Sequence, residues 1–559
     1  MPSGLDKDYD AMLAAITGEG GRVALGEDEQ GNVLVTSFPA TLPAFFDAFT
    51  GFYPDREAVV AGEERIGFPE LNALAGRVAR ALASGFGIQK GDRVGIAMVN
   101  SPAWILSYMG VLKPGGVAVL LNGWWEVPEL AHALALAEPK LILADEARAR
   151  KIAEAQPGAG IVPLAVDRPA EEALAPLFEK EKDNAALPEI VPEDDATILF
   201  TSGSTARAKG VVSTHRAVTT GVYSFALMLM VLKELIEREG REPPLPRTLI
   251  NVPLFHVTGE VPVFLNSFVT GRTMVLMSKW DAGEALRLIE QERITYFIGV
   301  PTMSLELIEH PEREKYDLST LTDIAAGGAP RPTAHVARLI EKIPHAQPAL
   351  GYGLTETNAV GCGNFWSNYP AKPASTGRPF RPFVDLVILD PGGKPLPPGE
   401  RGEIAIKSAA NFRGYWRDPE ATAAATTEEG YFRTGDIGYL DEEDYLYIVD
   451  RKKDIILRGG ENISGQEVEA EIYAHPAVSE AAVFGIADER LGEVPAAVVY
   501  SESGVGEEEL RDFLDGRIAA YKQPARIWLA ETPLPKLGTG KIDKLSLRRR
   551  HAAETEGGA

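Results

Sequence analysis

The chain has 559 residues, with 56 basic and 80 acidic side chains, and therefore a formal charge of −24. At about 100–200 residues per domain, this length indicates several domains or one large, subdivided core. Hydrophobic residues make up 45% and charged residues 24% of the chain, which is typical of globular proteins and excludes disordered and collagen-like classes. The acidic excess repels phosphate backbones, so we expect no nucleic-acid partner, although a local basic pocket for a small phosphate ligand is compatible with it.

Cys362 is the single cysteine, which excludes disulfide frameworks, cysteine-rich zinc sites and iron–sulfur clusters and suits a reducing compartment. The N-terminal residues MPSGLDKDYDAML lack the basic region and apolar stretch of a signal peptide. The longest apolar runs, such as Phe225–Leu232, fall far short of the ~20 residues that span a bilayer. We therefore expect a cytoplasmic protein with no transmembrane segment; a peripheral membrane contact and a homodimer are both compatible with the sequence.

The first 40 residues show no hydrophobic periodicity and are predicted to form an N-terminal extension. From Leu42 onward, helix-like stretches alternate with short β-rich runs, which predicts an α/β body with mostly parallel sheets. The predicted elements are a helix at Leu71–Leu82 and strands at Arg93–Ala97, Val117–Leu121, Leu141–Leu143 and Ala196–Phe200. The charged stretch 179–195 is predicted to be a surface connection.

The pattern changes near Asp450, where the charged break Asp450–Asp454 interrupts the alternation. Ser464 and Glu467 then have the spacing of a capping box at the start of a helix. Further predicted elements are strands at Tyr445–Val449, Ala481–Gly485, Ala496–Tyr500 and Arg526–Leu529 and a helix at Glu507–Ile518. We therefore predict a body at residues 41–450 and a small, mobile α+β lid at residues 451–559.

The segment Thr201-Ser202-Gly203-Ser204-Thr205-Ala206-Arg207-Ala208-Lys209-Gly210 follows the predicted strand Ala196–Phe200. Backbone N–H groups and hydroxyls in such a loop donate to phosphate oxygens, while the lysine supplies a point charge. It is not a Walker A loop, which has glycine before the lysine and serine or threonine after it. A phosphate-binding loop is the sharper interpretation, and a polar surface loop is the alternative.

Four other segments carry weaker signals when each is taken alone. A flat ring could approach the backbone at Gly327-Gly328-Ala329-Pro330. A second segment combines the aromatic face of Tyr352, the hydroxyl of Thr355 and the carboxylate of Glu356, which suits Mg²⁺. Asp436 suits a ribose diol, whereas His256 lies in an apolar segment and Lys541 lies in a glycine-rich one. The alternatives are plain turns, a core histidine and a solvated lysine.

Several common enzyme motifs are missing from the sequence. It contains no G-x-G-x-x-G dinucleotide fingerprint, no G-x-S-x-G nucleophile elbow and no H-E-x-x-H zinc motif. The eight histidines do not cluster with metal-ligand spacing. Rossmann dehydrogenases, esterases of the α/β-hydrolase type and zinc proteases are therefore not supported.

In their order along the chain, five segments together resemble the adenylate-forming superfamily of acyl- and aryl-CoA synthetases, peptide-synthetase adenylation domains and firefly luciferase. They are Thr201–Gly210, Tyr352–Glu356, Arg433–Asp436, Asp450–Asp454 and Pro535–Lys541. The resemblance extends from about Leu42 to about Leu545, and Pro253–Gly259 and Gly459–Ile463 resemble the acyl-CoA synthetase branch. It implies a carboxylate that attacks the α-phosphorus of ATP to give acyl-AMP and pyrophosphate, after which CoA displaces AMP; Mg²⁺ is the implied metal.

The resemblance also implies roles for individual residues. The phosphates would be held by Thr201, Ser202, Gly203, Ser204, Thr205 and Lys209. Mg²⁺ would be held by Glu356 and Thr205, and the α-phosphate would contact Thr355. Adenine would be surrounded by Gly328, Ala329, Pro330, Gly351, Tyr352 and Gly353. The ribose would be held by Asp436, with Arg451 nearby. Lys541 would bridge the carboxylate and the α-phosphate, and His256, Val257, Gly328 and Gly353 would contact the acid. After rotation about a hinge at Lys453, Gly459 and Gly460 would line the pantetheine channel.

The chain departs from the family pattern at Ala206, Ala208 and Gly465, where glycine, proline and proline are usual. Ser464 and Glu467 are expected to cap the helix that begins at Gly465. Met228 and Met230 suit an acyl-pocket wall or a buried core helix, and no basic residue is placed for a second carboxylate, so we expect an uncharged hydrophobic acid, fatty or alicyclic-aromatic. An enzyme that passes its acyl-AMP to a carrier protein and a non-catalytic nucleotide-binding relative remain the alternatives.

Overall fold

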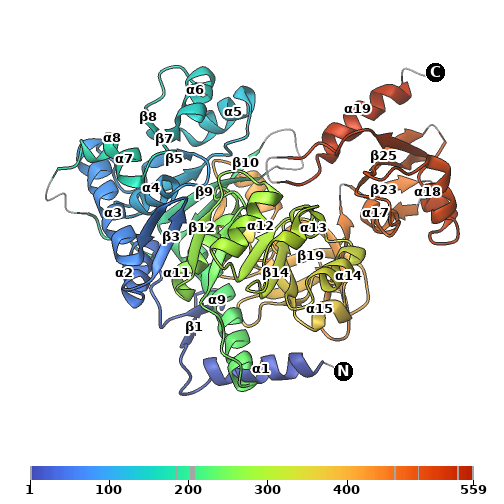
Figure 1. The fold of residues 1–559 in the computed structure, drawn as a ribbon, viewed down its shortest axis with the longest axis horizontal. Helices are drawn as coiled ribbons and strands as arrows, with labels where there is room; N and C mark the ends of the chain where they lie inside the picture. The colour runs from blue at the N-terminus through green and yellow to red at the C-terminus, as the bar shows by residue number, and fades with distance from the viewer. Residues whose placement is uncertain are drawn as a thin grey trace.

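The computed structural model of the chain describes residues 3–182, 187–201, 208–452, 454–458, 461–488, 490–537 and 540–556. A large body built on two mainly parallel sheets precedes a small C-terminal α+β domain, which lies at one end of the molecule (Figure 1). The predicted fold class is therefore confirmed. The domain limits stay predictions, and the predicted hinge residue, Lys453, lies outside the described residues.

The first sheet has seven strands in the order β20-β10-β9-β6-β5-β7-β8. Five are mutually parallel, and β10 and β20 form an antiparallel edge. Their bounds are β5 (Arg93–Ala97), β6 (Val117–Leu120), β7 (Leu141–Asp145), β8 (Ile161–Leu164), β9 (Asp195–Thr201), β10 (Lys209–Thr214) and β20 (Gly414–Tyr415). The four strands predicted in this region are confirmed, because short apolar runs fill buried central positions of a parallel sheet.

The second sheet has nine strands in the order β17-β16-β15-β14-β13-β11-β12-β3-β4. The six strands from β15 to β3 in this order are parallel, and the remaining strands pair antiparallel at the two edges. Their bounds are β3 (Glu57–Ala61), β4 (Glu64–Gly67), β11 (Arg247–Ile250), β12 (Thr273–Leu276), β13 (Tyr296–Gly299), β14 (Asp323–Gly327), β15 (Gln347–Tyr352), β16 (Cys362–Phe365) and β17 (Arg378–Pro379).

Apolar helices fill the core of the body. The central ones are α2 (Leu42–Phe52), α3 (Phe68–Arg80, which confirms the predicted helix), α4 (Pro102–Leu112) and α9 (His215–Arg238). Every residue of α4 is buried, as expected of a helix that is hydrophobic on all sides. The outer helices include α5 (Val127–Ala137), α6 (Glu146–Ala155), α12 (Ala282–Gln291), α13 (Pro301–Glu309), α14 (Thr333–Lys342), α15 (Asn368–Ala371) and α16 (Pro419–Ala424).

Helix α9 is longer than the apolar run predicted from the sequence. Its 24 residues are long and apolar enough, by length and composition, to cross a membrane. However, 67% of its most apolar stretch is buried inside the molecule, as in a core helix. The sequence-based estimate was too short because polar and small residues such as Thr219, Thr220 and Gly221 interrupt the hydrophobic run and are nevertheless buried.

The N-terminal segment contains a helix that the sequence analysis missed. α1 (Gly4–Thr17) begins at a capping box formed by Ser3 and Asp6, and it packs beside α9 (Figure 1). Asp6 is buried and accepts hydrogen bonds from Asn368 Nδ2 at 3.0 Å and from the Tyr445 hydroxyl at 3.1 Å. The partners that stabilise α1 are thus more than 350 residues away in the sequence, where no local pattern reveals them.

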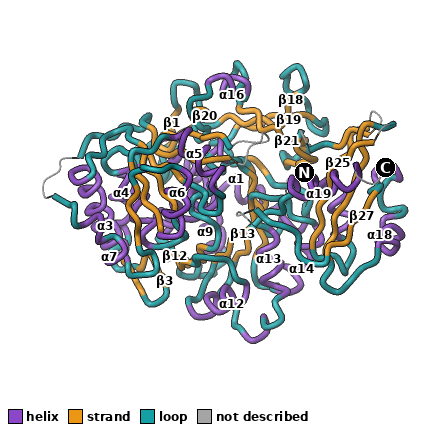
Figure 2. Tube along the Cα trace, turned by 90° about the horizontal axis from the view of Figure 1, so that it is seen from above, coloured by secondary structure: helices purple, strands orange, loops and turns teal. Residues whose placement is uncertain are grey.

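A third, antiparallel sheet links the body to the C-terminal domain, which forms its own layer of strands and helices (Figure 2). The linking strands are β18 (Asp385–Leu389), β19 (Gly402–Lys407), β21 (Phe432–Leu440) and β22 (Leu446–Arg451). The C-terminal elements are β23 (Ile456–Arg458), β24 (Glu461–Ile463), α17 (Gly465–Tyr473), β25 (Glu480–Asp488), β26 (Gly492–Tyr500), α18 (Glu507–Leu514), β27 (Arg526–Ala530) and α19 (Lys544–Glu556). The strands and the helix predicted here are confirmed with shifted ends.

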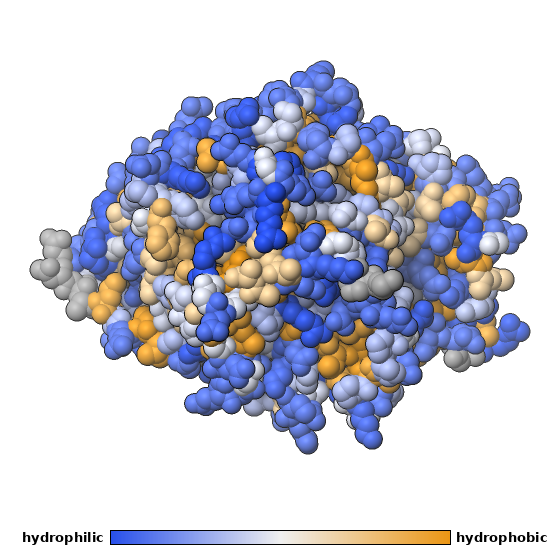
Figure 3. Space-filling model, turned by 90° about the horizontal axis from the view of Figure 1, so that it is seen from below, coloured by the Kyte–Doolittle hydropathy of each residue, from blue (hydrophilic) through white to orange (hydrophobic). Residues whose placement is uncertain are grey.

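The face of the molecule drawn in Figure 3 is mostly hydrophilic and carries separate, small apolar patches. Among the described residues, the exposed large hydrophobic side chains are scattered over the chain, for example Phe52, Leu245 and Leu457. Apolar residues exposed singly are normal for a globular protein. These exposed apolar side chains therefore do not by themselves mark a binding surface.

Candidate active site

The segments singled out in the sequence meet at the carboxyl ends of the parallel strands. Gly328-Ala329-Pro330 follows β14, Tyr352 ends β15, and Thr201 ends β9 opposite Lys209 in the antiparallel pair. Ligand sites of open α/β sheets lie at this edge because successive loops converge there. The topology therefore brings together segments that are 150 residues apart.

Tyr352, Asp436 and Arg451 form a connected polar group. The Tyr352 hydroxyl donates to Asp436 Oδ2 at 2.7 Å, and Arg451 Nε lies 3.4 Å from Asp436 Oδ1. Asp436 on β21 and Arg451 on β22 are direct cross-strand partners. Burial raises the pKa of the Asp436 carboxyl, whereas the Arg451 cation opposes that shift. Two strands of the third sheet thus present a carboxylate and a cation beside the aromatic side chain that ends β15.

Glu356 and Lys209 meet through a residue that the sequence analysis did not single out. The Tyr415 hydroxyl donates to Glu356 Oε1 at 2.8 Å, and Lys209 Nζ lies 4.5 Å from the centre of the Tyr415 ring. Glu356 is buried, and burial raises the pKa of its carboxyl, while the Tyr415 hydrogen bond and the Arg451 and Lys209 cations oppose that shift. Tyr415 was missed because its partners are close only in the folded chain.

Lys541 reaches from the C-terminal domain into the body. Its Cε and Nζ lie 3.3 and 3.6 Å from the position that a Cβ at residue 328 would take, so a side chain there would press against the end of the lysine. Gly328 also has φ +76°, a conformation that side chains disfavour. Burial lowers the pKa of Lys541 to about 8, and the Arg451 cation contributes, while Asp436 opposes the shift. The lysine therefore faces the Asp436 carboxylate on β21 and the Arg451 cation on β22 of the third sheet.

His256 interacts electrostatically with Lys541. Burial lowers the pKa of His256 to about 3, and the Lys541 cation adds to this effect, so the imidazole is neutral near pH 7. Its Nδ1 accepts the Thr258 backbone N–H at 3.2 Å and caps the short helix α10 (Val257–Gly259). Thr258 Oγ1 also lies 3.8 Å from the Cβ position at residue 328. The apolar segment around His256 thus borders the glycine beside Lys541.

The C-terminal domain contacts the body along α13 and α14. Lys536 Nζ lies 2.8 Å from Glu306 Oε1 on α13 and 2.9 Å from Glu480 Oε1 within its own domain. The Thr302 hydroxyl donates to the Gly540 carbonyl at 3.4 Å, and the His335 and Tyr473 rings pack edge to face at 5.2 Å. These contacts stabilise the arrangement in which Lys541 is inserted.

The remaining predicted site residues divide into two groups. Thr355 and Gly351 lie beside Glu356 and Tyr352, and a Cβ at Gly353 would lie 2.0 Å from the Ala359 carbonyl oxygen, so only glycine fits there. Val257 is buried, and Ala329 is partly buried next to Pro330. The second group lies outside the described residues: Ser202, Gly203, Ser204, Thr205, Gly459 and Gly460.

At residue 465, where the family usually has proline, the glycine of this chain makes a backbone hydrogen bond. Gly465 is the first residue of α17, and its backbone N–H donates to Asp450 Oδ2 at 2.7 Å, a bond that the usual proline could not make. Ser464 Oγ accepts the Glu467 N–H at 3.1 Å, which confirms Ser464 as the helix cap, whereas the Glu467 carboxylate accepts a hydrogen bond from Lys522 Nζ at 2.6 Å and does not complete a capping box. Asp450 and α17 lie on opposite sides of the predicted hinge, so this bond connects the two parts.

The described residues fit Mg²⁺ better than a structural metal. Among them, no group of three or more His, Cys, Asp and Glu side chains is arranged to hold an ion. Mg²⁺ is typically bound by one or two carboxylates together with substrate phosphates, and Glu356 is a buried carboxylate of this kind beside Lys209. The site therefore suits Mg²⁺ that binds together with a phosphate ligand.

Comparisons with known proteins identify the family. The AMP-binding enzyme model matches residues 46–416, and the AMP-binding enzyme C-terminal domain model matches residues 467–541. Feruloyl-CoA synthase of Amycolatopsis sp is 35% identical over 500 residues, which are 89% of this chain and 96% of the relative. Long-chain-fatty-acid–CoA ligase of Bacillus subtilis (strain 168) is 34% identical over 544 residues, with coverage of 91% and 94%.

Solved structures show the same relationship. ATP-bound MatB from Rhodopseudomonas palustris has a TM-score of 0.79 and 29% identity, and the match covers 92% of this chain and 99% of that one. The Mycobacterium tuberculosis fatty acyl CoA synthetase has a TM-score of 0.70 and 31% identity with the same coverage. The chain belongs to the AMP-binding enzyme family and is an ATP-dependent, AMP-forming acid–CoA ligase that uses Mg²⁺.

Proposed function

We propose that this ligase activates a hydrophobic carboxylic acid and that the residues around Lys541 carry its first half-reaction. The observation that supports this most strongly is the insertion of Lys541 beside Gly328, between the Asp436–Arg451 pair and His256. A cation at that point would meet both an α-phosphate and an acyl carboxylate.

In the first half-reaction an anion attacks a polyanion, so the site must supply positive charge and exclude water. Lys209 and the hydroxyls of Thr201 and its loop hold the outer phosphates, and Thr355 contacts the α-phosphate. Glu356 and Thr205 would hold Mg²⁺, which would supply further positive charge to the phosphates. Lys541 neutralises the carboxylate and the α-phosphate as the new bond forms.

Tyr352 packs on adenine beside Gly328, Ala329 and Pro330, while Gly351 and Gly353 let the ring approach the backbone. The Asp436 carboxylate accepts hydrogen bonds from the ribose hydroxyls, and Arg451 holds that carboxylate. The buried position of Asp436 and its 2.7 Å bond to Tyr352 support a fixed, preorganised ribose site.

The second half-reaction needs Lys541 withdrawn and the CoA thiol admitted. We place the pivot at Lys453, so that rotation of the C-terminal domain brings Gly459 and Gly460 to the pantetheine channel. The partly exposed ion pair between Lys536 and Glu306 supports a contact between the two parts that can open. The single, buried thiol of Cys362 supports a cytoplasmic, reducing setting.

The acid-binding region supports an uncharged substrate. His256, Val257, Gly328 and Gly353 border it, and the adjoining π-helical turn Glu260–Leu265 is buried beside α9. The one acid in that turn, Glu260, accepts a hydrogen bond from the Tyr108 hydroxyl at 2.6 Å, and burial raises its pKa to about 7. The acids after which relatives are named, ferulate, 4-coumarate and long-chain fatty acids, carry largely apolar groups beside the carboxylate.

A panel of acids assayed with ATP, Mg²⁺ and CoA tests this proposal. Octanoate, palmitate and ferulate are compared with acetate and malonate, and acyl-CoA and AMP are measured. Because each buried CH₂ contributes ~0.8 kcal/mol, kcat/KM for the best hydrophobic acid should exceed that for acetate by at least ~100-fold. A preference for malonate or acetate would rule out the hydrophobic pocket, and AMP release without a thioester would point to a carrier protein as acceptor.

A further inference from the structure

Tyr415 touches two residues of the proposed site with two different parts of its side chain. Its hydroxyl donates to Glu356 Oε1 at 2.8 Å, and its ring lies 4.5 Å below Lys209 Nζ. Glu356 and Lys209 come from segments almost 150 residues apart, and Tyr415 lies a further 59 residues along the chain from Glu356. One aromatic side chain therefore fixes the relative placement of a carboxylate and a cation.

The backbone around Tyr415 is held at both of those segments. The Trp416 N–H donates to the Gly210 carbonyl at 2.7 Å, next to Lys209, and the Phe412 N–H donates to the Glu356 carbonyl at 2.7 Å. The Tyr415 N–H donates to Thr422 Oγ1 at 2.9 Å, and the Phe412 and Tyr415 rings pack edge to face at 5.0 Å. Tyr415 thus has little freedom to leave its position.

A hydroxyl bonded to a carboxylate fixes the carboxylate's rotation, and such partners of metal-binding groups strongly affect metal affinity. A ring beneath an ammonium group attracts the cation and restrains a flexible four-carbon chain. We propose that Tyr415 is a positioning residue, whose hydroxyl orients Glu356 for Mg²⁺ and whose ring orients Lys209 for phosphate. This inference rests on the roles proposed above for Glu356 and Lys209.

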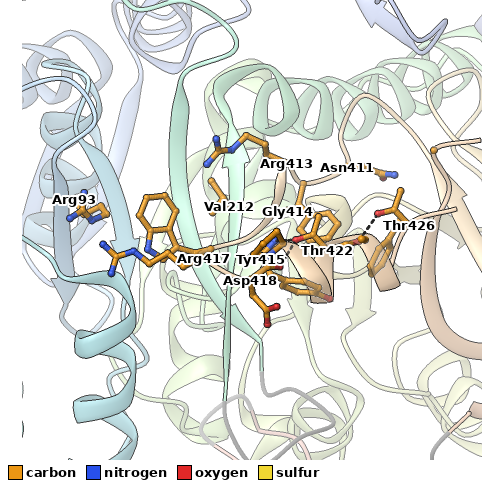
Figure 4. A pocket seen from close by; sticks show the side chains of 16 residues that line it. Arg93, Val212, Asn411, Arg413, Gly414, Tyr415, Arg417, Asp418, Thr422 and Thr426 are labelled. Carbon is orange, nitrogen blue, oxygen red and sulfur yellow. Dashed lines mark hydrogen bonds between the residues drawn. The ribbon is translucent and has the colours of Figure 1, made fainter. Parts of the chain in front are cut away.

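Tyr415 also lines a cavity of about 870 Å³ beside β20, together with Arg93, Trp416 and Arg417 (Figure 4). Because this cavity is open to solvent, a smaller side chain at position 415 leaves no sealed void in the core. Variants at position 415 are therefore expected to fold, and their effects can be assigned to the two contacts.

The test is calorimetric binding of ATP to the full chain, first in EDTA and then in increasing Mg²⁺. Tyr415→Phe keeps the ring and removes the hydroxyl, so ATP affinity in EDTA should stay within ~2-fold while the Mg²⁺ concentration for half-maximal enhancement rises ~10-fold. Tyr415→Leu also removes the ring, so ATP affinity in EDTA should fall ~5-fold as well. A merely structural role would weaken both measurements equally in both variants.

Tyr431→Phe is the matched control, because it removes another tyrosine hydroxyl that donates to a carboxylate, that of Asp385. It should change neither measurement. Glu356→Gln separates the inference from the proposed function. If Glu356→Gln abolishes the Mg²⁺ enhancement and Tyr415→Phe leaves it unchanged, the inference alone is overturned; if Glu356→Gln also leaves it unchanged, the metal assignment is wrong and the inference falls with it.

Discussion

Lys541 is a buried amine of the site whose pKa is lowered into the range of mildly alkaline pH. Burial in a position that also faces Arg451 lowers its pKa to about 8, so a substantial fraction of this side chain is neutral at mildly alkaline pH. Phosphate oxygens beside the amine favour the charged form and raise its pKa again. Binding of ATP is therefore coupled to protonation of Lys541.

We expect the chain to take up about half a proton from solution when it binds ATP at pH 8, and progressively less as the pH falls to 6.5. Proton uptake is measured by calorimetry in two buffers with different ionisation enthalpies. In Lys541→Arg, the guanidinium keeps its charge at every pH tested, so this uptake should disappear. The same uptake in wild type and Lys541→Arg would assign it to another group.

At the scale of elements, helix α17 is held to the body through its first residue. Gly465→Pro removes the N–H that Asp450 accepts, and losing a hydrogen bond to a charged group costs about 1.5–3 kcal/mol. Adenylation, measured as acid-dependent ATP–pyrophosphate exchange, should therefore slow by about 10- to 100-fold.

Gly465→Ala is the control for that variant, because alanine adds the same Cβ, 3.1 Å from the Val483 carbonyl oxygen, and keeps the N–H. The ratio of the exchange rates of the two variants gives the contribution of the hydrogen bond between residue 465 and Asp450. Equal rates in the proline and alanine variants would show that the Asp450 contact does not stabilise the adenylating arrangement.

Helix α13 carries the ion pair between Glu306 and Lys536, and both side chains are partly exposed. Glu306→Gln should slow the exchange reaction by about 2–5-fold, the effect expected of a partly exposed pair, and leave thioester formation from supplied acyl-AMP unchanged. Glu309→Gln, on the same helix, breaks a pair with Arg338 inside the body and should have no effect on either reaction. An equal loss in both variants would indicate damage to α13 itself.

Sequence patterns predicted elements well where local chemistry determines them. β5 was predicted with its observed ends, since a short apolar run in a central parallel strand is buried on both faces. α1 was missed because its stability depends on Asp6, whose partners Asn368 and Tyr445 lie far along the chain. The candidate site follows the same rule: motif residues such as Asp436 and Lys541 were identified by resemblance, whereas Tyr415 depended on contacts that only the fold creates.

For the whole molecule, a net charge of −24 coexists with a reaction between anions. The structure shows how this is compatible: Arg451 and Lys541 lie near one another at the junction of the two parts, and Lys209 lies beside Glu356 at the edge of the first sheet. Three cations thus lie where phosphates are expected to bind, although the chain as a whole is acidic. The C-terminal domain contributes one of these cations from near the end of the chain.

The central claim is that Lys541 serves the first half-reaction alone and leaves the site for the second. The measurement is a comparison of wild type and Lys541→Ala in acid-dependent ATP–pyrophosphate exchange and in thioester formation from supplied acyl-AMP and CoA. Removal of a cation that stabilises the transition state should reduce exchange by about 10²–10³-fold and change thioester formation by less than about threefold. An equal loss in both half-reactions would contradict this account.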